Sequence, residues 1–272
     1  MRAAIGCLAL LLVTSLSATP ALAQGPGRGG RGGPPPTPRA QAPADLTGQW
    51  VSVVTEDWRW RMTTPPKGDY ASVPLNADGR KVADAWDMAK DVAAGEQCRP
   101  FGAAALLRLP TRVRIAWQDD TTLTLETDAG QQKRTFAFAA PGAAPAATTA
   151  VVAPAQRSWQ GVSVAEWNKT AISRGLGFGG ARGTAGGNLK VTTTQLRPGY
   201  LRKNGVPYSA NATVTEYFIR HDEPNGDSWF TVTTIVEDPA YLAQPFITSS
   251  SFKKERDTST WNPSPCQTDA PR

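Results

Sequence analysis

Segments in which apolar and polar side chains alternate limit the possible folds of this chain more than any other feature. The clearest alternation lies in residues 112–117, 122–126 and 131–138, which are separated by short turns containing Asp or Gly. Successive side chains of a β-strand point to opposite faces, so each segment is predicted to be a strand with one apolar face. Because the turns are short, the three strands are expected to form an antiparallel meander.

Further Val-, Thr- and aromatic-rich segments extend this pattern in both directions. They are residues 49–56, 58–62, 159–167, 189–196, 213–220, 229–237 and 246–254. The Trp-Arg alternation of residues 58–62 is taken as a continuation of the first strand. About nine or ten strands predict a mainly β protein, with a single antiparallel β-barrel or strongly curved sheet.

One helix is predicted among these strands, over residues 77–90. Asn76 is a suitable N-cap, and Val82, Ala85, Trp86 and Ala89 fall on one face of the helix. Trp86 is expected to pack this helix against the sheet.

The N-terminus resembles a secretory signal, with Arg2, an apolar stretch over residues 5–13 and a small-residue cleavage site ending at Ala23. We therefore expect a periplasmic or secreted protein. Residues 24–44 are rich in Gly, Pro and Arg and are expected to be a disordered leader. The folded domain is placed at 45–266, with flexible insertions at 139–157 and 174–187 and a tail at 267–272.

Charge argues against a nucleic-acid partner. The net charge is +6, but four arginines precede residue 45, leaving 25 basic residues against all 23 acidic ones from Asp45 onward. A nearly balanced domain has no electrostatic reason to bind nucleic acid. The apolar stretch of the signal is too short to span a bilayer, and no later segment is continuously apolar, so no membrane span is expected. No oligomeric state is implied.

Two cysteines, Cys98 and Cys266, follow the signal sequence. An exported protein meets an oxidising environment, so we predict that they form a disulfide. The alternative is a pair of free thiols.

Histidine count restricts the chemistry, because His221 is the only histidine and it lies in a polar turn. A His-rich zinc site and a Ser-His-Asp mechanism are therefore disfavoured, and neither a metal nor a cofactor is expected. Strand alternation places Glu216 on the same face as Val214 and Phe218. If that face is interior, a buried carboxylate there would serve as acid, base or ligand anchor, or it would pair with an arginine on a neighbouring strand.

Two resemblances extend this interpretation. Residues 45–50, Asp-Leu-Thr-Gly-Gln-Trp, resemble the G-x-W signature that opens lipocalin-like barrels, and residues 215–217 resemble that family's T-D-Y. The resemblance implies that Trp50 closes one barrel end beneath an arginine from the last strand, here Arg256. The chain departs from the family in its higher strand count, its helix-bearing insertion at 65–95 and its Ala/Pro-rich linker.

The second resemblance is to a set of uncharacterised exported bacterial proteins. It is carried by residues 75–80, 98–100, 118–120 and 237–246 and spans most of the chain after Trp50. It implies export and a β fold but no reaction.

The leading hypothesis is a non-catalytic binding protein that takes a small, partly apolar or carbohydrate-like ligand inside the barrel. Candidate ligand-binding residues are Trp58, Trp60, Glu216 and Phe218, since paired aromatics and a buried carboxylate are common in such pockets. One alternative is a carboxylate-dependent enzyme centred on Glu216 that acts on a carbohydrate-like substrate. The other is an interaction module of the cell envelope.

Overall fold

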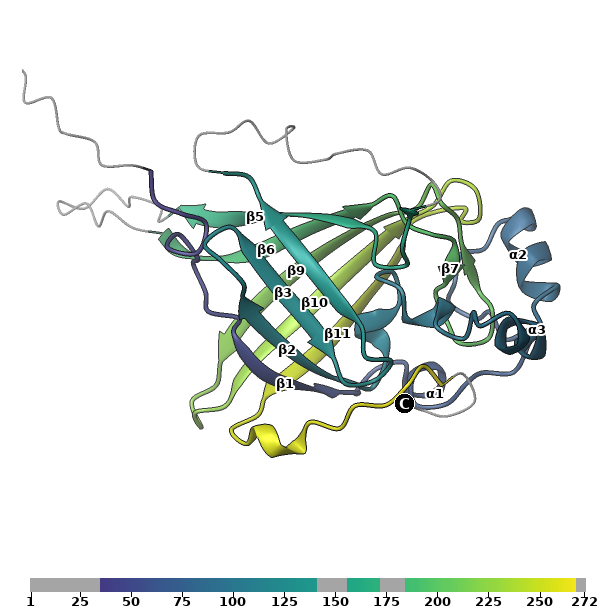
Figure 1. Ribbon diagram of the computed structural model, residues 1–272, viewed down its shortest axis with the longest axis horizontal. Helices are drawn as coiled ribbons and strands as arrows, with labels where there is room; N and C mark the ends of the chain where they lie inside the picture. Colours follow the sequence, from purple (N-terminus) through teal and green to yellow (C-terminus); the bar gives the residue numbers. More distant parts are fainter. Residues whose placement is uncertain (1–34, 141–155, 172–183, 268–272) are drawn as a thin grey trace, which may run out of the picture. The chain divides into compact units, whose positions relative to one another are not determined.

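The computed structural model describes residues 35–140, 156–171 and 184–267, and these form a closed β-barrel of nine strands (Figure 1). The order around the barrel is β1-β11-β10-β9-β6-β5-β4-β3-β2, after which β2 pairs with β1. The predicted mainly β fold is thereby confirmed. The signal sequence lies outside the described residues.

The barrel strands agree closely with the sequence pattern. Their bounds are β1 Gly48–Val53, β2 Arg112–Trp117, β3 Thr122–Thr127, β4 Lys133–Phe138, β5 Val162–Ala171, β6 Thr184–Thr194, β9 Thr213–Asp222, β10 Ser228–Glu237 and β11 Phe246–Lys254. A separate two-stranded hairpin consists of β7 Gly199–Tyr200 and β8 Pro207–Tyr208. Strand β6 begins inside the segment expected to be a flexible insertion.

One strand pair differs from the expected antiparallel barrel. β4 and β5 are parallel, with Phe136 opposite Ser163 and Phe138 opposite Ala165. Parallel neighbours need a connection long enough to return the chain to the same end of the sheet. The chain between β4 and β5, residues 139–161, has that length, and its residues 141–155 lie outside the described residues.

The Trp-Arg segment of residues 58–62 is helical and does not continue the first strand, so that prediction was wrong. α1, Trp58–Arg61, is a single turn preceded by Asp57 in the left-handed region, with φ 52°. Its Arg61 is buried and donates to the Arg108 carbonyl at 2.7 Å and to Glu56 at 2.5 Å. The period-two alternation was overridden because these tertiary partners hold the Arg61 side chain in a helical turn.

The predicted long helix is two helices. α2, Ala77–Asp84, is capped by Asn76, whose side-chain oxygen accepts from the Gly79 N–H at 2.8 Å, as predicted. α3, Met88–Ala93, follows because the Asp87 side chain caps a second start by accepting from the Ala89 N–H.

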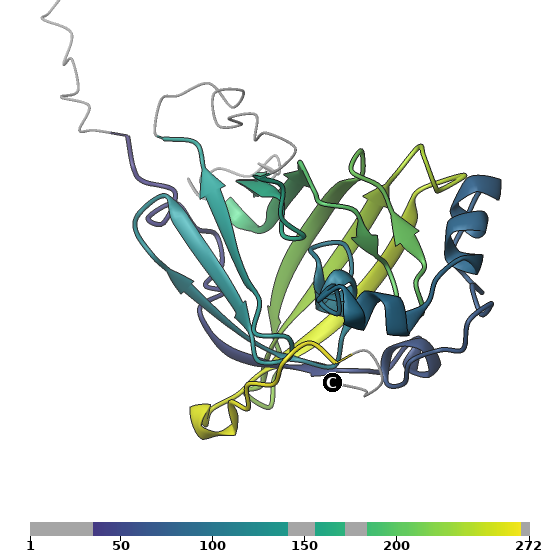
Figure 2. The same cartoon turned by 45° about the vertical axis from the view of Figure 1, so that its right-hand side comes forward.

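Trp86 lies in the break between these helices. Its indole packs on Gly205, in the turn between β7 and β8, where a Cβ would lie 2.0 Å from the ring. Glycine is required there both for space and for the positive φ of 79°. Figures 1 and 2 show α2, α3 and this hairpin together at one end of the barrel, which we call the helical end.

Aromatic rings fill the barrel interior. The ring centroids of Phe136 and Phe230 each lie 5.8 Å from that of Phe218. The Phe230 ring also contacts Trp50 and stacks on Phe252, with 4.7 Å between the two phenylalanine centroids. Aliphatic side chains from five of the strands, including Ile115, Leu123, Leu189 and Val232, complete this buried cluster. The space enclosed by the strands is thus a packed core.

Trp50 meets a cation from the last strand, as the lipocalin-like resemblance implied, but the residue differs. Lys254 Nζ lies 5.2 Å from the Trp50 ring, whereas Arg256 was expected. Lys254 still belongs to β11, where Trp50 pairs directly with it, and Arg256 comes after the strand has ended. The indole N–H of Trp50 donates to the Leu46 carbonyl at 2.9 Å.

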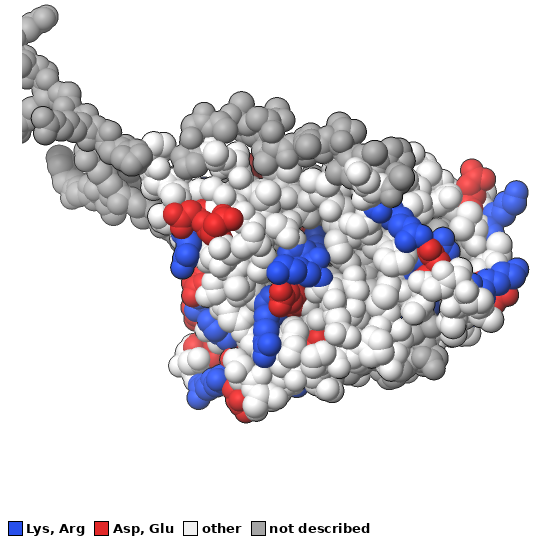
Figure 3. Space-filling view, in the orientation of Figure 1, with Lys and Arg blue, Asp and Glu red and all other residues white. Residues whose placement is uncertain are grey.

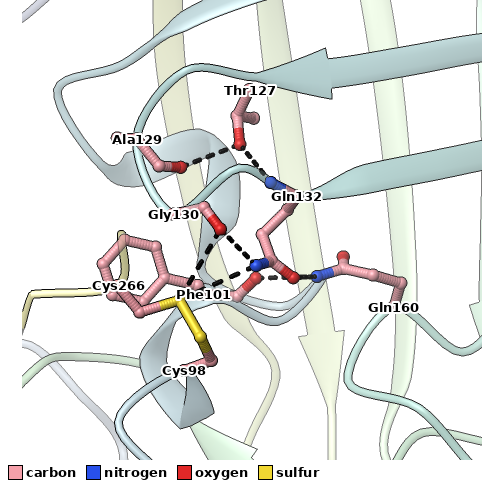
Figure 4. Close-up of a disulfide and its surroundings, with 8 residues drawn as sticks. All are labelled: Cys98, Phe101, Thr127, Ala129, Gly130, Gln132, Gln160 and Cys266. Carbon is pink, nitrogen blue, oxygen red and sulfur yellow. Dashed lines mark hydrogen bonds between the residues drawn. A yellow bond between two sulfur atoms is a disulfide. The ribbon is translucent and has the colours of Figure 1, made fainter. Parts of the chain in front are cut away.

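The predicted disulfide between Cys98 and Cys266 is present (Figure 4). Beside it, the Gln160 side chain donates to the Phe101 carbonyl and to Gln132, so the bond lies in an ordered hydrogen-bond network. The disulfide fastens the C-terminal segment to the helical end of the barrel. Such bonds are characteristic of oxidising compartments.

No helix within the described residues is long and apolar enough to cross a membrane.

The disulfide should contribute strongly to stability, because it closes a loop of 168 residues. The double variant Cys98→Ser/Cys266→Ser is expected to lose roughly 4 to 5 kcal/mol of unfolding free energy, mainly through the greater entropy of its unfolded chain. Urea unfolding followed by circular dichroism measures this loss. The same measurement in reductant is the control, since reductant should destabilise the natural protein and leave the variant unchanged. Equal stability of the two oxidised proteins would contradict the prediction.

Candidate functional site

The four candidate ligand-binding residues lie in two separate places. Glu216 and Phe218 point into the barrel from β9 and are fully buried. Trp58 and Trp60 lie on α1, where Trp58 is 65% exposed and Trp60 donates its indole N–H to Asp69 at 3.2 Å. The expected common strand face of the two tryptophans does not exist, because the segment is helical.

Glu216 forms a buried ion pair. Arg134 Nη1 and Nη2 donate to its two carboxylate oxygens at 2.9 and 2.6 Å, and both side chains are 0% exposed. Arg134 Nη2 also donates to the Thr193 hydroxyl, which in turn shares a hydrogen bond with Ser163. The ion pair with an arginine, weighed above as an alternative, is confirmed.

The partner is not on a neighbouring strand. Arg134 lies on β4 and Glu216 on β9, and β5 and β6 separate these strands. The pair therefore joins two parts of the barrel wall through the interior. Since each Glu216 oxygen already accepts a charge-assisted hydrogen bond, the carboxylate is held as a structural anion.

Removing one member of this pair should be costly. Glu216→Gln leaves the buried Arg134 charge uncompensated and is expected to lower the unfolding free energy by about 3 to 5 kcal/mol. The double variant Arg134→Met/Glu216→Leu should regain most of that loss, because no buried charge remains. Denaturant unfolding of Glu216→Gln, Glu216→Leu, Arg134→Met and the double variant measures these losses, and the last three together with the natural protein complete a double-mutant cycle. A Glu216→Gln protein as stable as the natural one would contradict a structural role.

A second aromatic group lies at the barrel end opposite the helical end. Phe138 lies 5.5 Å from Trp117 and 5.3 Å from Trp167 between ring centroids, and the two tryptophans are 6.3 Å apart. Strand alternation directs all three side chains inward, from the ends of β2 and β4 and from the middle of β5. Both tryptophans are only partly buried. We call Trp117, Phe138 and Trp167 the aromatic mouth.

The described part of the leader, residues 35–44, lies against the aromatic mouth. Trp167 donates its indole N–H to the Pro38 carbonyl at 2.8 Å, and the Arg39 N–H donates to the Asp120 carbonyl at 3.1 Å. Lys169 Nζ donates to the side-chain oxygen of Gln41 at 2.8 Å.

A groove of about 300 Å³ remains between the leader and the barrel wall. Its apolar wall comes from Phe138, Ala165 and Trp167, and its rim carries the charged side chains of Glu166 and Lys169. Glu166 is paired with Lys190 at 2.7 Å, whereas the acceptor found for Lys169 is the neutral amide of Gln41. A groove with one apolar wall and an ammonium group at its rim suits a ligand that is apolar with a polar or anionic end.

The strands that carry the aromatic mouth were predicted from the sequence, but the meeting of its three rings was not. Trp117 and Phe138 end segments that were predicted to be strands with one apolar face, and Trp167 ends the predicted strand 159–167. The missing information was the parallel β4–β5 pairing, which brings Trp167 beside Phe138 and has no local sequence signal.

Other chemistry is not favoured at the surface of the described residues. His221 is half-exposed and lies 3.8 Å from Glu223, and the described part of the chain brings no three His, Cys, Asp or Glu side chains together as a metal site. On the face shown in Figure 3, basic and acidic side chains lie side by side with broad uncharged areas between them. The aromatic mouth is therefore the candidate site.

Comparison of the chain with protein-family models, curated proteins and solved structures finds no match.

Proposed function

We propose that this chain is an exported, non-catalytic binding protein that takes a small, partly apolar ligand at the aromatic mouth of its barrel. The observation that carries the proposal is the group of three mutually contacting rings beside an open groove. Partly buried aromatic rings that converge on a groove offer large apolar contact area in a fixed geometry.

Ligand chemistry follows from the groove. Its volume of about 300 Å³ lies at the small end of the range for small-molecule sites. The ring faces favour a flat apolar body, and Lys169 favours an anionic or hydrogen-bond-accepting end. The Pro38 and Gln41 side of the groove belongs to the leader, so the ligand either fits beside the leader or displaces it.

Two features of the sequence support this function. The signal-like N-terminus supports export, and the lipocalin-like opening supports a barrel that is sealed near Trp50. In the structure the barrel interior is occupied by its aromatic cluster. A ligand therefore has room at the mouth, and not around Glu216 and Phe218 where the leading hypothesis placed it.

Catalysis by Glu216 has less support. A general acid or base must reach its substrate and exchange a proton with it. Both oxygens of Glu216 accept hydrogen bonds from Arg134, and the side chain has no exposed surface.

The mouth can be tested with anilinonaphthalene sulfonate, a flat aromatic probe with one anionic group. The mature protein should bind one equivalent with enhanced probe fluorescence and altered tryptophan emission. Trp167→Ala should weaken probe binding at least about fivefold, because it removes one wall of the groove.

Trp229→Ala is the matched control, since Trp229 lies on the outer face of β10 beneath Lys253. It should bind the probe like the natural protein. Equal probe affinity of the natural protein and Trp167→Ala, with both folded by circular dichroism, would refute binding at the mouth.

A further inference from the structure

The turn between β7 and β8 is basic and yet buried. Leu201, Arg202, Lys203 and Asn204 are each no more than 5% exposed, beneath the helices of the helical end. Asn204 anchors the turn by donating its side-chain amide to the carbonyls of Pro66 and Asp69, each at 3.0 Å. Arginine and lysine are seldom buried unless their charges are paired, so this turn requires an explanation.

The hydrogen-bond donors of the Arg202 side chain are the least satisfied in this turn. Its side-chain atoms Nε, Nη1 and Nη2 are all buried, and none has a hydrogen-bond partner among the described residues. A guanidinium group has five N–H donors, and burying them without acceptors is unfavourable. Burial, with a smaller contribution from the nearby charge of Arg108, lowers the pKa of Arg202 to about 10.

The neighbouring arginines differ from Arg202 because each has a carboxylate partner. The pairs are Arg59–Asp69 at 2.8 Å, Arg61–Glu56 at 2.5 Å and Arg108–Asp57 at 3.1 Å. Asp57 and Asp69 attract the Arg202 charge as well, but each already accepts from another arginine. We call these four arginines and their three carboxylates the cluster. It therefore has one positive charge more than it has negative charges.

Trp60 covers this unsatisfied group. The Arg202 guanidinium carbon lies 4.9 Å from the centroid of the Trp60 ring, a stacked arrangement that leaves the in-plane N–H donors unused. Trp60 belongs to α1, a single helical turn that begins next to Asp57 in its left-handed conformation. A short surface element thus separates the guanidinium from solvent.

We propose that Arg202 is the anchor of a binding site for a singly charged oxyanion, of the carboxylate or phosphate type. The planar guanidinium would hold two oxygens of the anion side by side, and Arg108 would add a second positive charge. The anion would complete the charge balance of the four arginines. Entry requires α1 to move, because Trp60 lies over the guanidinium. This site is independent of the aromatic mouth, which lies at the other end of the barrel.

A purely structural role is the competing explanation. In that case the longer-range attraction of Asp57 and Asp69, with the stacking on Trp60, would suffice to hold the Arg202 charge. The two explanations differ in whether an added oxyanion stabilises the folded protein.

The test is titration of the mature, disulfide-bonded protein with sodium acetate and, separately, with sodium phosphate, at an ionic strength held constant with sodium chloride. Thermal unfolding and calorimetry should show a midpoint that rises with oxyanion concentration and one binding site per chain. Arg202→Met should weaken that binding at least tenfold. Arg202→Lys, which keeps the charge but loses the fork of donors, should bind the anion more weakly than the natural protein.

Arg114→Met is the matched control, because Arg114 also stacks on a tryptophan, Trp261 at 4.1 Å, but lies outside the cluster. It should respond to the anions like the natural protein. If Arg202→Met does not fold, Arg202→Lys carries the comparison. The proposal is overturned if neither oxyanion raises the unfolding midpoint beyond chloride, or if the folded Arg202 variants bind the anions as tightly as the natural protein does.

Discussion

Closure of the sheet is the constraint on which the rest of this structure depends. When β2 pairs with β1, no barrel strand is left with an unpaired edge, and every inward side chain must share one enclosed space. Aromatic rings fill most of that space, and the Arg134–Glu216 pair fills a part of it with charge. A buried ion pair is tolerable there because its hydrogen bonds are nearly complete and its geometry is bidentate.

The two ends of the barrel are covered by different elements, and each end carries one of the two proposed binding sites. At the helical end, the disulfide, the short helices and the β7–β8 turn form a dense cover in which Arg202 lacks an acceptor. At the other end, three rings and the leader leave a groove open to solvent. The first end offers a charged and covered site, whereas the second offers an apolar and accessible one.

Local patterns predicted individual elements well where one residue type dictates the geometry. The alternation in β2, β3 and β4, the Asn76 cap and the Cys98–Cys266 bond all follow from rules that act within a strand, a turn or a pair of thiols. The same rules failed at α1, because the buried Arg61 side chain donates to the Arg108 carbonyl, which is distant along the chain. They also missed the end of α2, where Asp87 starts a new helix instead of continuing the old one.

The sequence by itself determined the fold class, most strand positions and the strand face that Glu216 shares with Val214 and Phe218. Only the tertiary structure decided that Arg134 meets Glu216 across the barrel, that Trp167 joins Trp117 and Phe138, and that Arg202 is buried without an acceptor. The physical reason is that side-chain direction is a local property of the backbone. The partner that a side chain meets depends on strand order and on closure, which no single segment encodes.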